Sequence, residues 1–426
     1  MLKTRISLIA LGLLSATQAM ANDQANANGF VEDSSMNVLL RNAYMNRDKK
    51  HGKNDQIQWG QGVITNFSSG FTQGTVGVGV DAFGLYAVRL DGGTGHNEGA
   101  GIDFFKRGDS ENAQHDIARG GAAVKFRVSN TVLKYGDQMP TLPVLQYDDS
   151  RLLPESFTGT LVTSKEIEGL ELNAGRFTQE ARKSAEQRDS GLKSINVFGG
   201  SYKFTNNLSA SLYGSDVEDV MKKQYLGINY VMPIAAERSL TLDFNGYKSK
   251  MDRQYVEREG LNGRDNTIWS LAATYAFGPH SITLAHQRST GDTGYNYGGY
   301  QNDHGVGDGG STIYLANSYW SDFNAEDERS WQLGYGLDFG AFGVPGLTYK
   351  VAYVRGDNIN THGLGEGTER EIFNQFKYVV QAGPAKDLSV KLRSSFLRTS
   401  NNLNTIKYND DGNEVRVFVE YPISVF

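Results

Sequence analysis

The chain has 426 residues, no cysteine and a formal net charge of −6, with 50 glycines, 22 tyrosines and 21 phenylalanines but only eight prolines. The acidic balance argues against nucleic acid as a partner, and the lack of cysteine excludes a disulfide framework. Many glycines and aromatic residues with few prolines are typical of strands and tight turns, not of a helical protein.

The first 21 residues have the pattern of a secretory signal. Lys3 and Arg5 precede an apolar run at 6–14, and small residues lead to Ala21. We therefore expect a signal peptide at 1–21 and a single mature domain at 22–426. The apolar run is too short to span a bilayer, and no later stretch approaches the roughly 18 apolar residues of a membrane helix.

Most of the remaining chain consists of segments in which apolar and polar residues alternate, which predicts strands with two different faces. In the segment 122–128, Lys125 and Arg127 alternate with apolar residues; Lys391 and Arg393 do so in 388–396, and Arg416 does so in 414–421. Similar segments are SYKFTNNLSASLYG, KQYLGINYVMP, SLTLDFNGYKS, TIWSLAATYAFG, HSITLAHQR and SWQLGYGLDFG.

Full charges recur on the polar faces along the whole mature chain. A soluble sandwich also alternates, but a single sandwich seldom exceeds about 250 residues. We therefore predict an all-β fold, a transmembrane antiparallel β-barrel with apolar residues toward lipid and charged residues toward a wet lumen. At about 22 residues per strand with its turn, it has about 18 strands. Pro422 interrupts the last alternation, which predicts a bulge or a chain end that leaves the sheet.

The stretch 140–157, PTLPVLQYDDSRLLPESF, holds three of the eight prolines: Pro140, Pro143 and Pro154. Each proline fixes its own φ and restricts the residue before it, so a long loop loses less entropy when it becomes ordered. Because a barrel of this size encloses an aqueous channel, we expect this loop to fold inward and narrow it. A proline-rich surface loop, with Arg151 as a solvated charge, is the alternative.

Other motifs do not predict chemistry. Residues 305–310 match GxGxxG but have no nucleotide-binding strand and helix around them. The seven histidines lack the paired spacing of metal ligands, and no GxSxG is present. We therefore expect no enzymatic activity, no cofactor and no metal.

Eight stretches together resemble the OprD family of Gram-negative outer-membrane porins, and they extend over the whole mature chain. They are GFVEDSSMNVLLRNAYMNRD, SGFTQGTVGVGVDAFG, GGAAVKFRVSNTVLKYGDQMPTLPV, SRLLPESFTG, GLELNAGRFT, NLSASLYG, FGVPGLTYKVAYVRG and YVVQAGPAKDLSVKLR. The resemblance implies an 18-stranded barrel whose third extracellular loop forms the narrowest point, and a ladder of basic side chains that steers carboxylates.

The matching ladder positions are Arg47, Arg127, Lys391, Arg393 and Arg416, with Arg41 and Lys134 as further candidates. Alternation independently places Lys125, Arg127, Lys391, Arg393 and Arg416 on lumen faces. Guanidinium groups bind carboxylates through two parallel hydrogen bonds and stay charged at any relevant pH. The alternative for each cation is a structural one, in which it balances an acidic residue across the lumen.

The predicted substrate-binding set also includes Arg151 of the proline-rich loop and Asp303 and Asp308 in a glycine-rich stretch. The resemblance implies acidic groups opposite the ladder that hold a cationic end of the solute. This chain has Asn296 and Ser311 at those points, with the two aspartates nearby.

We expect passive uptake of small carboxylate-bearing solutes through the outer membrane of a Gram-negative bacterium. Amino acids and short peptides fit this class, and the resemblance adds carbapenem antibiotics. The alternatives are a channel for carboxylates without preference for a cationic tail, a surface adhesin and a surface hydrolase. The expected surroundings are outer-membrane lipid, with the barrel as a monomer or homotrimer.

Overall fold

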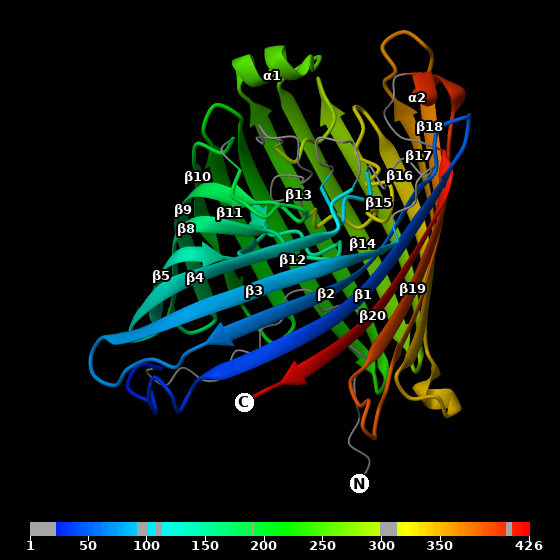
Figure 1. The fold of residues 1–426 in the computed structure, drawn as a ribbon. Helices are drawn as coiled ribbons and strands as arrows, with labels where there is room; N and C mark the ends of the chain where they lie inside the picture. The colour runs from blue at the N-terminus through cyan, green and yellow to red at the C-terminus, as the bar shows by residue number, and fades with distance from the viewer. Residues whose placement is uncertain (1–22, 92–100, 107–112, 190, 299–312, 406–410) are drawn as a thin grey trace.

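The computed structural model describes residues 23–91, 101–106, 113–189, 191–298, 313–405 and 411–426. Its main body is one antiparallel sheet of 18 strands that closes on itself (Figure 1). The closure is made by β1 (Ser35–Lys49), which pairs with both β2 (Gln56–Ser68) and β20 (Gly412–Ser424). A closed sheet has no free edge, so its backbone groups pair within the barrel as a hydrocarbon surrounding requires. The predicted barrel and strand number are confirmed.

Each further barrel strand pairs with its neighbours in sequence. They are β3 (Gly77–Asp91), β4 (Asp116–Val128), β5 (Thr131–Gln138), β8 (Ser156–Ile167), β9 (Leu170–Ala181), β10 (Ile195–Lys203), β11 (Leu208–Val217), β12 (Met221–Ala235), β13 (Arg238–Met251), β14 (Asp265–Phe277), β15 (His280–Gly291), β16 (Arg329–Asp338), β17 (Leu347–Ile359), β18 (Gly367–Val379) and β19 (Ser389–Thr399). Outside the barrel lie β6 (Thr141–Leu142), β7 (Leu145–Gln146), α1 (Arg253–Glu259), α2 (Asn401–Thr405) and a 3-10 helix at Phe339–Phe342. Within the described part of the chain, no helix has the length and apolar character to cross a membrane.

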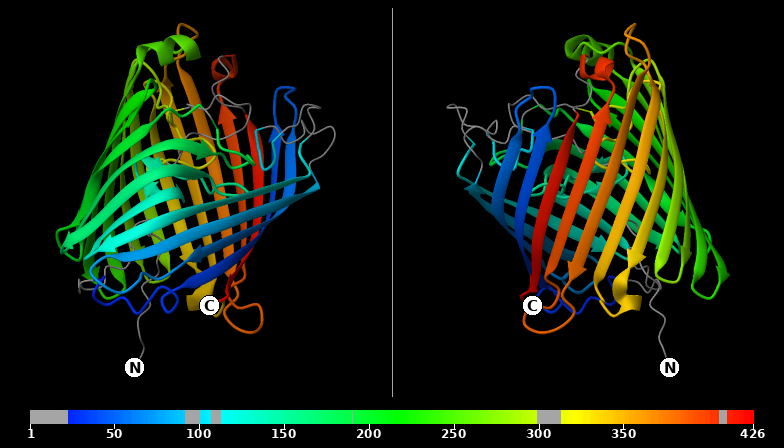
Figure 2. Two further views of the ribbon diagram at one scale, coloured as in Figure 1. Left: turned by 60° about the vertical axis from the view of Figure 1, so that its left-hand side comes forward. Right: turned by 90° about the vertical axis from the view of Figure 1, so that its right-hand side faces the viewer.

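The two ends of the barrel differ. α1, α2 and the long connections lie at one end, whereas the C-terminus and mostly short turns lie at the other (Figures 1 and 2). In outer-membrane barrels the short turns face the periplasm and the long loops face outside. Numbered from the N-terminus, the extracellular loops used below are L2 (92–115), L3 (139–155), L4 (182–194) and L7 (292–328), the first and last of which are described in part.

The apolar residues face outward. On β4, Phe126 is 39% exposed whereas Lys125 beside it is 6% exposed, and on β20 the values for Val415 and Arg416 are 38% and 8%. A soluble protein has the opposite distribution, because exposed apolar area in water costs about 25 cal/mol per Å². The arrangement therefore requires lipid outside and polar groups inside, as the alternation predicts.

The prediction that Pro422 marks a bulge or ends the strand is wrong. β20 continues in register with β1, where Pro422 stands opposite Leu39. The N–H of Val425 donates to the carbonyl of Met36 at 2.8 Å, and since paired positions alternate, the nitrogen of Pro422 faces β19. The pairing with β19 has already ended at Glu420, so the proline removes no ladder bond.

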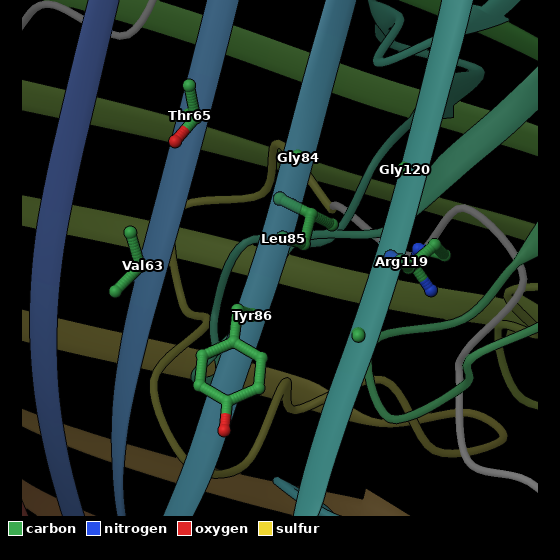
Figure 3. A pocket seen from close by; sticks show the side chains of 8 residues that line it. Val63, Thr65, Gly84, Leu85, Tyr86, Arg119 and Gly120 are labelled. Atoms are coloured by element: carbon green, nitrogen blue, oxygen red, sulfur yellow. The ribbon is translucent and has the colours of Figure 1, made fainter.

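The outer wall has a hollow of about 460 Å³ across β2, β3 and β4. Gly84 and Gly120 stand opposite each other there, and without side chains they leave a depression that Val63 and Tyr86 border (Figure 3). Arg119 lies beside this hollow on β4, but its side chain points into the lumen, where it contacts Pro154 of L3. The hollow is thus a feature of the lipid-facing surface, separate from the channel.

Candidate functional site

L3 folds into the lumen and touches widely separated strands. Tyr247 on β13 donates its hydroxyl hydrogen bond to the carbonyl of Pro143 at 3.2 Å. On β1, Arg41 donates to Asp149 at 2.6 Å and to the carbonyl of Leu152 at 3.4 Å. Because β1 and β13 lie on different walls of the barrel, the loop crosses the lumen, which confirms the predicted constriction loop.

The two ends of L3 are sealed against the inner wall by apolar side chains. Leu145 packs in a cluster with residues of β8 to β14, and Leu152 packs with Phe105 of L2 against β1 to β4. The loop approaches β2 so closely that a Cβ added at Gly60 would lie 2.5 Å from the Leu152 side chain. The glycine in this strand is therefore required by the constriction.

A buried group of charges holds L3 against L4. Lys183 forms an ion pair with Asp148, and both side chains are less than a tenth exposed. Arg119 donates to the carbonyl of Pro154 at 2.5 Å and also to carbonyls of L4. Two hydrogen bonds between Asp148 and Glu155 close the neck of the loop. The N–H of Glu155 donates to the carbonyl of Asp148 at 3.0 Å, and the N–H of Asp148 donates to the side-chain Oε2 of Glu155 at 3.0 Å. L3 therefore depends on L4 for its position.

The buried surroundings shift the pKa values of two carboxyl groups of L3, Asp148 and Glu155, in opposite directions. Burial acts to raise the pKa of Asp148, but Lys183 and Arg151 outweigh it and hold that pKa below the ordinary value. Burial, and then the neighbouring carboxylate of Glu180, raise the pKa of Glu155 well above its ordinary value. Asp148 thus favours its charged form, and Glu155 favours its neutral form.

Part of the basic lumen set is neutralised by the protein itself. Arg47 on β1 and Arg416 on β20 both donate to Glu414, at 2.7 and 2.5 Å. On the other side, Lys125 of β4 contacts Asp81 at 2.7 Å. Pairs of this kind orient the cations and reduce their attraction for a mobile anion.

A second part of the basic lumen set forms no direct ion pair within the described residues. Lys391 and Arg393 on β19 form no hydrogen bond or ion pair with any described residue, and the Nε of Arg393 is buried without an acceptor. Lys391 lies 4.8 Å from the ring centre of Phe418, and Arg393 lies 5.0 Å from that of Phe373. Aromatic faces hold cations in place without neutralising them, so this wall presents available positive charge to the lumen.

The registers extend this wall in two rows across neighbouring strands. Lys350 of β17 and Arg393 stand opposite the same residue of β18, Gln375. Lys377 of β18 stands directly opposite Lys391. Lys350 and Lys377 were not among the predicted site residues; like Lys391 and Arg393, their side chains have no ion pair within the described ranges. We call Lys350, Lys377, Lys391 and Arg393 the basic wall.

Another part of the lumen wall, on β12 and β13, is rich in tyrosine. Tyr225 and Tyr247 contact each other and Tyr295 and Tyr314 of L7. Lys223 on β12 is buried beneath them, where its ammonium donates to the hydroxyl of Tyr295 at 3.0 Å. Sequence reasoning also missed Lys223, although its alternation with the outward Leu226 and Ile228 carried the signal.

The remaining predicted residues lie elsewhere. Arg127 lies on the inner face near the periplasmic end of β4, 4.2 Å from the ring centre of Phe71, and donates to Gln24 at 3.0 Å. Arg151 links L3 to L2 through the carbonyl of Ile102 at 2.8 Å. Neither is brought beside the basic wall. Asp303 and Asp308 lie outside the described residues.

A closed barrel with an apolar outer face, a charged lumen and an inward-folded loop defines an outer-membrane channel. The chain belongs to the OprD family of outer membrane porins, whose family model matches residues 28–425. Members of this family are substrate-specific channels, not enzymes, and they reside in the outer membrane.

Individual relatives support the same assignment. The chain is 42% identical to Porin D of Pseudomonas aeruginosa, over 96% of this chain and 94% of that one. The crystal structure of OccAB1 of Acinetobacter baumannii is similar with a TM-score of 0.88 and 38% identity, and covers 95% of this chain and all of that one. OpdK of Pseudomonas aeruginosa, solved with vanillate, has a TM-score of 0.80 and 32% identity, over 93% of this chain and all of that one.

Proposed function

We propose that this porin takes up small solutes that carry a carboxylate, and that amino acids, short peptides and carbapenem antibiotics belong to this class. The observation that carries the proposal is the pair Lys391 and Arg393, cations on the lumen face whose side chains form no hydrogen bond or ion pair with the described residues. A buried donor without an acceptor costs about 1–3 kcal/mol, and a carboxylate in transit would relieve that cost.

The basic wall also has the spacing that conduction requires. Lys391 and Arg393 are two residues apart on one strand, or about 7 Å. A carboxylate can therefore leave one cation as it meets the next, and several weak sites in sequence permit both entry and release. Arg416 stands directly opposite Arg393 on the next strand, and Arg416 and Arg47 share Glu414, so basic side chains continue from β19 onto β20 and β1. The structure of OpdK with vanillate, an aromatic carboxylate, agrees with this class of solute.

The second candidate is a channel for carboxylates without preference for a cationic tail. It is favoured by Asn296 in L7, a neutral residue where the family resemblance implies an acid. Its side-chain oxygen accepts hydrogen bonds from the Tyr255 hydroxyl at 3.4 Å and from the N–H of Gly298 at 2.7 Å. We propose the carboxylate as the recognised group, with the barrel acting as a monomer or homotrimer and residues 1–21 removed as a signal peptide.

The test is uptake into liposomes that contain the porin, with each carboxylate compared against its amide. We expect the double variant Lys391→Gln with Arg393→Gln to reduce carboxylate influx about fivefold or more and to leave amide influx unchanged. Lys248→Gln is the matched control, because Lys248 is an exposed cation on the outer face of β13. Equal loss for acid and amide would mean that the variant only narrows or distorts the pore. Comparison of arginine with citrulline decides between the two candidates.

A further inference from the structure

The outer face of the barrel carries a row of three arginines toward its extracellular end. Arg355 of β17, Arg370 of β18 and Arg398 of β19 stand opposite one another in the strand registers. Their side chains point outward. The residues before two of them, Val354 and Leu397, are fully buried on the lumen side, and side chains alternate between the two faces of a strand. The right-hand view of Figure 2 shows these strands from outside, with α2 above them.

None of the three arginines forms a direct ion pair with the part of the chain that the structure describes. Arg355 and Arg370 form no hydrogen bond or ion pair with the described residues, and Arg398 donates to neutral oxygens, among them the carbonyl of Gly412 at 2.8 Å. Strands lie about 4.8 Å apart, and like charges directly opposite one another destabilise a sheet. An anion bound between the three guanidinium groups would offset their mutual repulsion.

A hollow of about 200 Å³ lies between these side chains, and Thr399 and Ser400 contribute to its lining. Two acids also border it, and both already accept hydrogen bonds from other residues. Asp411 accepts from the N–H of Thr399 and pairs with His51 at 2.8 Å, and Glu369 accepts from Ser321 at 2.7 Å. The hollow therefore presents guanidinium and hydroxyl donors, which suit phosphate.

An apolar row lies immediately below the arginines, toward the membrane centre. Leu333, Tyr353, Ile372 and Phe396 stand opposite one another on β16 to β19, and each is between 42% and 61% exposed. Donors for an anion thus adjoin a continuous apolar surface on the same four strands. That combination matches an amphiphile whose phosphate group is attached to acyl chains.

We propose that Arg355, Arg370 and Arg398 form a binding site for the phosphate groups of an acylated glycolipid in the outer leaflet. Its acyl chains lie against the apolar row of β16 to β19. Position favours a lipid over free phosphate, because the arginines are on the lipid-facing surface and directly above residues that only lipid covers. The site faces away from the lumen, so solute transport does not depend on it.

The test is native mass spectrometry of the purified full-length porin in detergent, titrated with diphosphoryl lipid A. We expect Arg355→Gln with Arg370→Gln to weaken lipid A binding about tenfold, and chemically dephosphorylated lipid A to bind the wild type as weakly as the double variant does. The matched control is Arg238→Gln, an exposed arginine at the periplasmic end of β13. Unchanged single-channel conductance and heat-resistant mobility show that each variant is folded.

Two outcomes overturn the proposal. Equal lipid A affinity in the wild type and the folded double variant would mean that the arginines do not bind its phosphates. Displacement of lipid A by millimolar inorganic phosphate, with no contribution from the acyl chains, would mean a site for free anions instead. Loss of binding in Arg238→Gln to the same extent would show a general charge effect and would also contradict a defined site.

Discussion

Removal of the Lys183 ammonium is expected to release the constriction without unfolding the barrel. Lys183→Met keeps most of the length of the apolar side chain but removes the ammonium that pairs with Asp148. The side chains of Lys183 and Asp148 are 2% and 8% exposed, so water does not replace the lost partner.

Loss of one partner of a buried ion pair costs about 3–5 kcal/mol. Asp148 keeps the N–H of Ser150 at 2.6 Å and the nearby charge of Arg151, which places the cost at the lower end. A change of about 3 kcal/mol shifts the ratio of displaced to docked L3 roughly 150-fold. The 18-stranded sheet does not contain this pair and stays closed.

Single-channel recording in planar bilayers measures the result. We expect Lys183→Met to give a larger mean conductance and frequent fluctuations between current levels. Lys193→Met is the control, since Lys193 belongs to the same loop but pairs with Asp219 at the surface, with both side chains more than half exposed. A steady current of wild-type size in a folded Lys183→Met channel would refute the argument that this pair positions L3.

Three further predictions concern the same loop. Gly60→Ala places a methyl group 2.5 Å from the fully buried side chain of Leu152, so L3 must shift and the conductance should change. The control is Gly84→Ala, whose methyl group meets nothing within 4 Å and which should conduct as wild type. The pKa of Asp148 is lowered in the fold, so its stabilising contribution is present above the ordinary carboxyl pKa of about 4 and is lost as pH falls through the lower folded value. Conductance recorded from pH 7 to 3 should therefore stay steady to about pH 4 and fluctuate only below it; fluctuation already at pH 6 would contradict this. Because the raised pKa of Glu155 favours the neutral acid, Glu155→Gln should preserve the wild-type conductance and reduce its sensitivity to alkaline pH, and a loosened channel at pH 7 would show that the charged form is required.

The inside-out distribution of side chains could be predicted from the sequence because it is a local property. The period of two on β4, β19 and β20 places Lys125, Arg393 and Arg416 inward whatever their partners are. The alternation of apolar and polar residues is absent on β17, because two of its inward-facing residues, Ala352 and Val354, are apolar. Both share the inward face with Lys350 and are fully buried. Loop segments of L7 cover that wall, so its inward residues are apolar and the lysine among them gave no alternating signal.

The sequence could not show which lumen cations are free to bind a solute, because ion pairs with acidic residues depend on contacts that only the closed barrel creates. Glu414 meets Arg47 from the other end of the chain, 367 residues away in sequence. The interpretation of Pro422 failed for a similar reason. Whether a proline removes a ladder bond depends on where the neighbouring strand ends, and the sequence around Pro422 does not contain that information.

The central claim is that the basic side chains of β19 face the wet solute path and that their neighbours face lipid. The chain has no cysteine, so single cysteines introduced as Arg393→Cys and Leu392→Cys can be compared directly. During bilayer recording with an anionic methanethiosulfonate reagent, we predict rapid modification at position 393 with a fall in carboxylate flux, and no modification at position 392. Rapid modification at 392 with none at 393 would contradict the account.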